Sequence, residues 1–306
     1  MSPKTPEAQP PLLVLGLPGA GGLPAQLAAQ LQCGCGELAL HRFPDGECLV
    51  RLDADVQGRC VVFVGSLDQP DDKTLPLIFA ADAARELGAA QVGLVAPYLA
   101  YMRQDHRFRA GEAVTSRTYA RLLSGALDFL VTVDPHLHRW HSLGEIYSIR
   151  TRVVAAAPAI AAWLRREVGA PLLVGPDEES EQWVAEVARL CGAPWTVMVK
   201  QRRGDRDVAV KMTGSASWPG RTPVLLDDIG SSGQTLVAAL QVLGQSGLRG
   251  ALCIVVHALF APQAHQAMLD AGAARVVSCD TIAHPSNAIA VAPLLGPAVL
   301  EMAAAS

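Results

Sequence analysis

Residues 223–234 read PVLLDDIGSSGQ, and this stretch indicates both the local fold and a ligand. An apolar run ends in Asp227 and Asp228, a loop of glycine and serine follows, and Thr235 opens a helical stretch. Such a loop presents backbone N–H groups at a helix N-terminus, where a phosphate is favoured. Carboxylates suit sugar hydroxyls or Mg²⁺ instead. The stretch therefore predicts a site for a phosphorylated sugar; the alternative is an ordinary strand-to-helix turn with a capping serine.

The composition indicates an α/β protein that binds small molecules. The 306 residues are 50% hydrophobic and 18% charged, so two domains with sizeable cores are expected, although one large α/β domain is permitted. A net charge of −4 and a pI near 6.1 argue against a nucleic-acid surface. No apolar run reaches the roughly 20 residues that span a bilayer, and the start lacks the layout of a signal peptide. We therefore expect a cytoplasmic protein with no membrane partner.

The cysteines predict no disulfide framework. There are seven, an odd number, and they are scattered along the chain. Reduced thiols fit this pattern best. Cys33-Gly34-Cys35 could form half of a metal or redox site, but no second motif of this kind accompanies it.

Short apolar runs alternate with helical stretches along the chain, which predicts mainly parallel sheets flanked by helices. We expect a disordered, proline-rich tail at 1–10, a domain at 11–150 and a second at 151–306, with the last residues packing back on the first domain. The expected strands are 12–17, 38–43, 48–52, 60–67, 91–96, 129–133, 172–175, 195–199, 224–226, 251–257 and 275–278, and the expected helices are 23–31, 74–87, 115–123, 153–167, 179–190, 236–243 and 262–269.

Two polar segments of the first half fit a nucleotide but have plainer interpretations. Residues 42–47, RFPDGE, form a turn sequence that by itself indicates a hairpin with surface acids. Residues 103–107, RQDHR, offer arginines for phosphate oxygens and an amide and a carboxylate for polar edges. The alternative is a solvated charged loop.

Two further segments have the composition of an ion or phosphate site. Residues 134–141, DPHLHRWH, hold three histidines, whose neutral rings suit zinc, although no cysteine or carboxylate signature completes such a site. Residues 199–207, VKQRRGDRD, leave a predicted strand. Lysine and arginine over a phosphoryl group are what phosphoryl transfer requires, while a charge run is usually only a wet loop.

In order and spacing, these segments together resemble one family. FPDGE, RQDHRFRAGE, VDPH, the GPD at 175–177, KQR and DDIGSSGQT are similar to segments of the ribose-phosphate diphosphokinases, the synthetases of phosphoribosyl pyrophosphate. The resemblance covers about residues 12–293 and is closer to the archaeal-type branch in the Asp-Pro-His triplet, the Lys-x-Arg loop and Ser231. It implies two phosphoribosyltransferase-like domains side by side, with ATP and ribose 5-phosphate between them.

The resemblance also implies roles for residues of the first half. Phe43, Asp45 and Glu47 match a hairpin that reaches across a subunit interface to the adenine, which implies a homo-oligomer, at least a dimer. The segment Arg103, Gln104 and Asp105 matches the ATP-binding segment, with Arg103 near the phosphates. His136 matches a position that helps to organise Mg²⁺.

The second half carries the remaining implied roles. Asp177 matches a second position for Mg²⁺, near the ribose, and Lys200 and Arg202 match a mobile catalytic loop. Asp227 and Asp228 match the acids that hold the ribose hydroxyls. The cradle for the 5-phosphate is implied at Ser231, Ser232, Gly233, Gln234 and Thr235.

The implied reaction is attack of the ribose 1-hydroxyl on the β-phosphorus of ATP, with release of AMP and assistance from Mg²⁺. Two alternatives stay open. A phosphoribosyltransferase would consume phosphoribosyl pyrophosphate and leave the ATP segments without a role. A regulatory paralogue would bind the ligands without forming AMP.

Three positions depart from the family pattern. Ser231 stands where most bacterial members carry an acid, and Gln234 where a glycine is usual. Glu179 and Ser180 replace a pair of small residues, and Glu178 adds another acid. Extra carboxylates would repel a phosphate unless a cation faces them, or they begin the next helix, where acids suit the dipole.

Overall fold

The chain forms two compact units in a computed structural model that describes residues 10–202, 208–212 and 218–304, without the side chains of 200–202 and 208–212. Unit 1 comprises residues 1–154 and 292–306, and unit 2 comprises residues 155–291. Unit 2 is thus inserted into the sequence of unit 1. Each unit contains one seven-stranded sheet.

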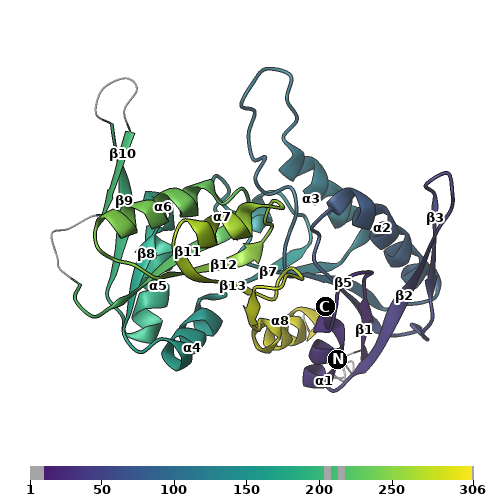
Figure 1. Cartoon of the computed structure of the whole chain (residues 1–306). Coiled ribbons are helices and arrows are strands. Elements are labelled where there is room, and N and C mark those ends of the chain that lie inside the picture. Colours follow the sequence, from purple (N-terminus) through teal and green to yellow (C-terminus); the bar gives the residue numbers. More distant parts are fainter. Residues whose placement is uncertain (1–9, 203–207, 213–217, 305–306) are drawn as a thin grey trace, which may run out of the picture. The chain divides into compact units, whose positions relative to one another are not determined.

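The sheet of unit 1 has the strand order β3-β2-β1-β4-β5-β6-β7 (Figure 1). Every neighbouring pair is parallel except β2 and β3, which form an antiparallel hairpin. The strands are β1 (Leu12–Gly16), β2 (Gly34–Arg42), β3 (Cys48–Leu52), β4 (Cys60–Val64), β5 (Gln91–Ala96), β6 (Phe129–Val133) and β7 (Arg150–Val154). The helices are α1 (Leu23–Leu31), α2 (Pro70–Glu86), α3 (Thr115–Ala126), the short η1 (Leu143–Glu145) and α8 (Ala292–Ala304).

The central strands of unit 1 explain why the sequence showed continuous apolar runs there. β4 (CVVFV) and β6 (FLVTV) are buried at every residue, as expected for parallel strands covered on both faces. By contrast β3 at the edge alternates between partly buried and exposed residues, and Leu38 is the single buried residue of β2. The core of the unit therefore lies under β1, β4, β5 and β6.

Helix α8 brings the end of the described chain back to unit 1. Arg150 Nη1 donates to Met302 O at 2.6 Å, and Gln30 Nε2 donates to Pro293 O at 3.3 Å. Arg152 and Glu301 form an exposed ion pair at 3.3 Å. β7 belongs to unit 1 as well, so the expected boundary after residue 150 cuts through a strand.

Unit 2 repeats the topology of unit 1, with the strand order β10-β9-β8-β11-β12-β13-β14. Again all pairs are parallel except one edge hairpin, here β9 and β10. The strands are β8 (Pro171–Gly175), β9 (Trp195–Arg202), β10 (Val208–Met212), β11 (Thr222–Gly230), β12 (Ala251–Ala258), β13 (Ala273–Cys279) and β14 (Asn287–Ile289). The helices are α4 (Ala157–Glu167), the short η2 (Glu178–Ser180), α5 (Glu181–Cys191), α6 (Gln234–Gln245) and α7 (Ala264–Asp270).

The sequence located most of these elements. β5 and β6 and α1 occupy the expected residues. β7, β10, β14 and α8 were not expected, and residues 153–156, expected to be helical, end β7 and lead into α4. The expected strand 224–226 is much longer, because β11 continues through both acids to Gly230.

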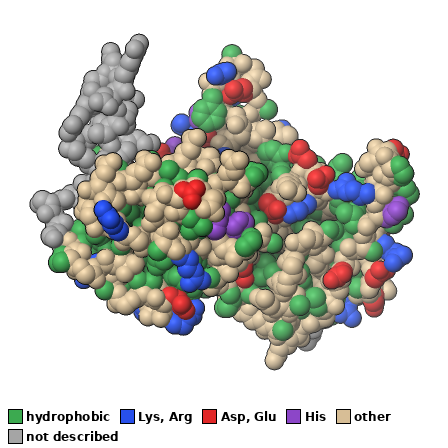
Figure 2. All heavy atoms as spheres, viewed as in Figure 1, with side chains coloured by type: hydrophobic (Ala, Val, Ile, Leu, Met, Phe, Trp, Pro, Cys, Tyr) green, Lys and Arg blue, Asp and Glu red, His purple; other side chains and the backbone are tan. Residues whose placement is uncertain are grey.

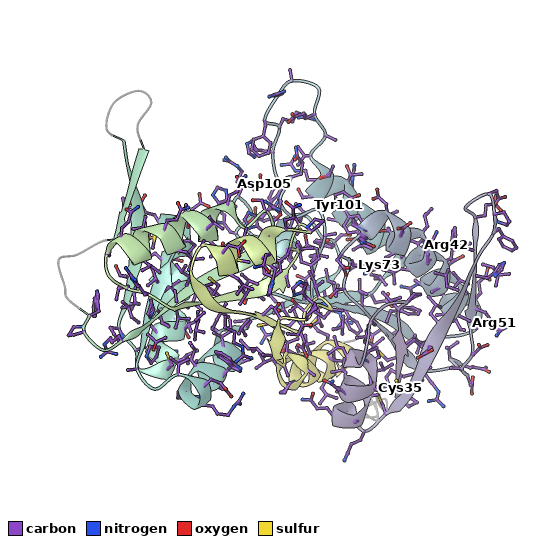
Figure 3. All side chains as sticks on the ribbon, viewed as in Figure 1. Cys35, Arg42, Arg51, Lys73, Tyr101 and Asp105 are labelled. Atoms are coloured by element: carbon purple, nitrogen blue, oxygen red, sulfur yellow. The ribbon has the colours of Figure 1, made fainter. Side chains whose placement is uncertain are left out.

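The loop after β4 differs from its counterpart in unit 2. It leads into α2, whose first turn carries Asp71 and Asp72. Lys73 Nζ lies over this loop, donating to Asp68 Oδ1 at 2.6 Å and to Ser66 O at 3.0 Å, and Tyr101 donates its hydroxyl hydrogen to Asp71 (Figure 3). Side chains of α2 and of the segment after β5 therefore bind this loop and the first turn of α2.

Neither the surface charges nor the cysteines form a regular pattern in the described residues. On the face drawn in Figure 2, lysines and arginines are interspersed with acids over the described residues. All seven cysteines are free. Among the described residues, none of the helices has both the length and the hydropathy needed to cross a bilayer.

A glycine of β5 permits the tight packing of the core of unit 1. Gly93 is the register partner of Phe129, and a Cβ at Gly93 would overlap the phenyl ring. We therefore expect Gly93→Ala to lower the free energy of unfolding by about 1–3 kcal/mol in urea denaturation. Gly125→Ala is the matched control, because a Cβ at this position of α3 meets no atom within 4 Å. Equal stability of Gly93→Ala and the parent would contradict the packing.

Candidate functional site

Two adjacent carboxylates lie at the carboxyl end of β11. Asp227 and Asp228 are half-buried, and the backbone N–H of Asp228 donates to Asp227 Oδ1 at 2.9 Å. Both belong to the strand rather than to the loop after it, and Asp227 is in register with Val255 of β12. The sheet therefore fixes the backbone of the acids, and their neighbours in β12 hold them at its carboxyl edge.

The electrostatics around Asp227 favour the protonated acid. Burial raises its pKa to about 8, together with the charge of Asp228, a hydrogen bond with Asp228 and the charge of Asp177. Three carboxylates thus concentrate negative charge at this edge of unit 2. A cation or a set of hydroxyl donors at this position would relieve the repulsion.

The loop between β11 and α6 is held from behind by the segment after β12. The ring of Phe260 lies where a Cβ of Gly230 would be, and Ala261 N donates to Ser231 O at 3.1 Å. Gly233 has φ 74°, which favours glycine, and a Cβ there would approach Ala264 Cβ at 3.3 Å. The back of the loop is therefore packed.

The front of the same loop is open. Ser232, Gln234 and Thr235 are exposed, and Ser231 is half-buried. Gln234 begins α6, and the first turn of this helix carries no acid. The side chain of Gln234, which replaces the usual glycine, is thus accommodated at the surface, while the N–H groups of the helix N-terminus face the loop.

Asp177 begins the short helix η2. Its Oδ1 accepts from Ser180 N at 3.2 Å, and its carbonyl oxygen accepts from Ser180 Oγ at 2.6 Å. The hydroxyl of Ser180 fills the space over Gly175, so this departure from the family pattern closes the turn. Glu178 and Glu179 are exposed in η2, immediately before α5. They lie in the turn that leads into the helix, as one of the two interpretations had it.

Lys200 and Arg202 lie on β9, in register with Val210 and Val208 of β10. The backbone thus places the basic segment in the edge hairpin of unit 2 (Figure 1). Residues 203–207, which continue the segment, lie outside the described residues.

The hairpin β2–β3 carries three of the expected ATP residues. Phe43 is 41% exposed, its ring meets that of His41 edge-on at 4.6 Å, and its N–H donates to Glu47 O at 2.8 Å. Asp45 Oδ1 accepts from Glu47 N at 3.0 Å, so this carboxylate stabilises the turn. An exposed phenyl ring at the tip of a hairpin is thus free to meet a ligand or another chain.

The expected ATP segment 103–105 divides into an exposed and a buried part. Arg103 is exposed and Gln104 half-buried, whereas Asp105 is buried, with His106 Nδ1 at 2.7 Å and Arg139 Nε at 3.6 Å. Burial alone raises the pKa of Asp105, but the hydrogen bond from His106 and the charges of His106 and Arg139 outweigh it and lower the pKa. Asp105 therefore anchors the segment. The sequence did not indicate its contact with Arg139, because Arg139 is distant in sequence.

The backbone turns sharply after β6. Asp134 has φ 32°, a left-handed conformation that is costly outside glycine, and its N–H donates to Val154 O at 3.1 Å. His136 is half-buried, and its ring lies parallel to that of His138 with 6.1 Å between the centroids. Within the described part of the chain, no three His, Cys, Asp or Glu side chains are grouped to hold a metal ion.

Two units with the same sheet order, and in unit 2 an acid pair followed by a phosphate-type loop, define a phosphoribosyltransferase-type fold in duplicate. The model of the N-terminal domain of ribose phosphate pyrophosphokinase matches residues 12–126, and that of the phosphoribosyl transferase domain matches residues 143–293.

Known proteins are similar over nearly the whole length. A ribose-phosphate pyrophosphokinase of Methanopyrus kandleri is 35% identical over 94% of this chain and 98% of its own, and one of Methanothermobacter thermautotrophicus is 30% identical over 92% and 98%. The fold matches the crystal structure of phosphoribosylpyrophosphate synthetase from Mycobacterium smegmatis with a TM-score of 0.82, at 23% identity, over 95% of this chain and 99% of that one. The chain belongs to the ribose-phosphate pyrophosphokinase family.

The raised pKa of Asp227 predicts a pH dependence of stability. The folded chain keeps a proton on Asp227 that the unfolded chain releases near pH 4, so ionisation costs the folded state stability as pH rises from about 4 to about 8. The Asp227→Asn variant has no ionisable group at this position, so its folded state does not lose this stability as pH rises. Its free energy of unfolding, relative to the parent, should rise across this window by up to about 1.4 kcal/mol per pH unit.

The measurement is urea denaturation at several pH values, with Asp270→Asn as a control at an exposed acid of α7. Parallel pH curves for the parent and Asp227→Asn would contradict the crowding of the three carboxylates.

Proposed function

We propose that this chain is a ribose-phosphate diphosphokinase, which transfers the β,γ-diphosphoryl group of ATP to the 1-hydroxyl of ribose 5-phosphate. The products are phosphoribosyl pyrophosphate and AMP. The observation that supports this most directly is the acid pair Asp227–Asp228, followed at once by a loop that is packed behind and open in front. Membership of the family gives the same activity.

Unit 2 is the proposed site of ribose 5-phosphate. Asp227 and Asp228 accept hydrogen bonds from the ribose hydroxyls, and the 5-phosphate takes the N–H groups of residues 231–235 at the start of α6. The absence of acids in the first turn of α6 favours an anion there. This orientation leaves the 1-hydroxyl at the acid end of the site.

Unit 1 is the proposed site of ATP. Arg103 is the proposed phosphate contact, and the exposed ring of Phe43 is the proposed contact to an adenine. Because Phe43 stands at the tip of a hairpin, we propose that it serves a neighbouring copy of the chain, so that the active form is at least a dimer. Both proposed substrates are highly charged phosphates that do not cross a bilayer unaided, so we propose a cytoplasmic enzyme.

The proposed divalent cation is Mg²⁺, and the excess of carboxylates around Asp227 fits a cation. The described residues form no complete metal cage, which fits an ion that takes most of its ligands from substrate phosphates and water. Asp177 in unit 2 and His136 in unit 1 are the proposed protein contacts. When bound, the ion would offset charge on the transferring phosphates.

Lys200 and Arg202 are the proposed catalytic residues. Their position in an edge hairpin allows them to approach the transferring group from outside the sheet. Each cation then donates hydrogen bonds to phosphate oxygens whose charge changes in the transition state, and their approach excludes water. Removal of either is therefore expected to lower turnover more than the binding of ribose 5-phosphate.

The test is to incubate the full chain with ATP, Mg²⁺ and ribose 5-phosphate, and to follow AMP and phosphoribosyl pyrophosphate together. We expect equal amounts of the two products, with turnover lowered at least about 100-fold in Lys200→Ala. The Kd of ribose 5-phosphate should change by less than about threefold.

Arg189→Ala is the control, because Arg189 is an exposed residue of α5 that is paired with Glu186. A folded parent that binds ribose 5-phosphate but forms no AMP would support the regulatory paralogue. Consumption of phosphoribosyl pyrophosphate with a purine or pyrimidine base, and no reaction with ATP, would support a phosphoribosyltransferase.

A further inference from the structure

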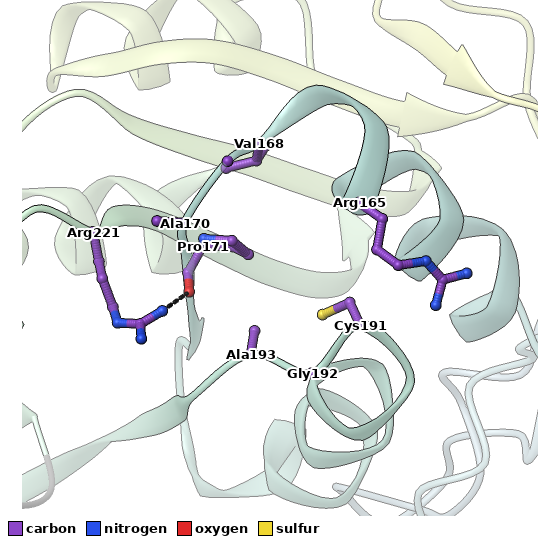
Figure 4. Close-up of a pocket in the computed structure, with 9 residues that line it drawn as sticks. Arg165, Val168, Ala170, Pro171, Cys191, Gly192, Ala193 and Arg221 are labelled. Atoms are coloured by element: carbon purple, nitrogen blue, oxygen red, sulfur yellow. Dashed lines mark hydrogen bonds between the residues drawn. The ribbon is translucent and has the colours of Figure 1, made fainter.

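A cavity of about 350 Å³ in unit 2, where α4 and α5 end, does not bring charged groups together. Its two arginines, Arg165 and Arg221, are exposed and lie on opposite sides of it, and each donates to a backbone carbonyl (Figure 4). Polar and aromatic side chains do converge in unit 1, at the turn that precedes the proposed ATP segment.

Tyr101 lies in this turn, between β5 and the proposed ATP segment 103–105. Its φ is 62°, in the left-handed region, which is unfavourable for a residue that carries a side chain. Its neighbours Ala100 and Met102 are buried, each with 2% of its surface exposed. The backbone is therefore held in a strained conformation where it leads into Arg103.

Two contacts hold the side chain of Tyr101. Its hydroxyl donates a hydrogen bond to Asp71 Oδ1 in the first turn of α2 (Figure 3). This bond, with burial and the charge of Asp71, raises the pKa of Tyr101, so the hydroxyl stays protonated and can donate. The ring of Tyr101 also meets that of Tyr119 of α3, with 4.8 Å between the centroids and a tilt of 51°. Both helices therefore hold this side chain.

Tyr119 is itself fixed to α2. Thr74 Oγ1 donates to Pro70 O at 2.5 Å, which uses the single hydrogen of this hydroxyl. The hydroxyl of the buried Tyr119 therefore donates to Thr74 Oγ1, at 3.0 Å. The ring against which Tyr101 packs is thus fixed in position.

The proposed ATP segment is also held beyond Arg103. Gln104 O accepts from Ser116 N of α3 at 3.3 Å, and Asp105 is buried. Arg103 lies between these contacts and Tyr101. It is exposed, and its side chain makes no hydrogen bond or ion pair with the described part of the chain. The direction of its guanidinium therefore depends on the backbone on either side of it.

We propose that Tyr101 is a positioning residue for ATP, because its hydrogen bond to Asp71 stabilises the left-handed backbone that directs Arg103 toward the phosphates. The role of Arg103 as a phosphate contact is taken from the proposed function, on which this assignment rests. Without the hydrogen bond, the backbone at Tyr101 can relax to a more common conformation, and the chain after it changes direction. ATP is then bound more weakly, although no group that contacts it has been removed.

Two other interpretations of the hydrogen bond predict different results. If it only joins a turn to α2, its loss lowers the stability of the fold and leaves the binding of ATP unchanged. If only the charge of Asp71 matters, removal of this carboxylate lessens the repulsion of an anion, and the Kd of ATP falls. A positioning role alone predicts that the loss of Asp71 weakens the binding of ATP.

The first experiment is calorimetric titration of the full chain with ATP and Mg²⁺, and separately with ribose 5-phosphate. We expect the Kd of ATP to rise about fivefold in Tyr101→Phe and in Asp71→Ala, and that of ribose 5-phosphate to stay within about twofold. Asp71→Asn keeps an oxygen that accepts the hydrogen bond and should bind ATP like the parent. Asp72→Ala is the matched control, because Asp72 is the neighbouring exposed acid of the same first turn and pairs with Arg42 instead.

The second experiment tests whether the effect passes through Arg103. In Arg103→Ala, which lacks the proposed phosphate contact, the further change Tyr101→Phe should alter the Kd of ATP by less than about twofold. The double variant Tyr101→Phe/Asp71→Ala should have the same Kd as each single variant, because both changes break one hydrogen bond. Circular dichroism shows whether each variant is folded.

Four results would overturn the proposal. They are no binding of ATP to the parent, an unchanged Kd of ATP in Tyr101→Phe, an equal loss of affinity in Asp72→Ala, and an undiminished effect of Tyr101→Phe in Arg103→Ala. A parent that binds ATP with the expected dependence on Tyr101, Asp71 and Arg103 but forms no AMP would support the positioning role and contradict the proposed function alone.

Discussion

A central parallel strand that is buried on both faces is the constraint on which each unit depends. β11 can carry Asp227 and Asp228 at its carboxyl end because β8 and β12 pair with the apolar residues before them. Burial that favours the strand also raises the pKa of Asp227, so the same packing creates the fold and the electrostatic imbalance. The acid pair therefore destabilises the folded state locally, and burial of the apolar core around it offsets this loss of stability.

Because the fold is duplicated, the two sheets have equivalent edge hairpins, and these hairpins carry different side chains. The hairpins β2–β3 and β9–β10 occupy the same place in the two strand orders, and carry an exposed phenylalanine and the basic segment, respectively. The loops after β4 and β11 also correspond. In unit 1 the first turn of α2 carries Asp71 and Asp72, and Lys73 pairs with Asp68 of the loop, whereas the first turn of α6 in unit 2 carries no acid. Of these two corresponding loops, only the one after β11 is open at the start of its helix.

The sequence was sufficient for the elements with strong apolar runs or clear turn chemistry. β6 and the turn at residues 44–46 are examples, because burial and local backbone geometry determine both. Helix α8 was missed, since its partners α1, β6 and β7 are distant in sequence, whereas the missed edge strands β10 and β14 are short. For the same reason nothing near Asp105 or Gly230 indicated Arg139 or Phe260 as a neighbour. The resemblance to a family identified the residues expected at the site. The residues that pack against them were found only in the three-dimensional structure.

The return of α8 to unit 1 has a consequence for the order in which the chain is made. On a ribosome, all residues of unit 2 emerge before residues 292–304 become available, so the unit that begins first is completed last. Until then the surface of β6, β7 and α1 that α8 covers is exposed to solvent. The nascent unit 1 therefore has an incomplete core until α8 has been synthesised. Unit 2, in contrast, is a continuous segment and needs nothing that comes after it in the chain.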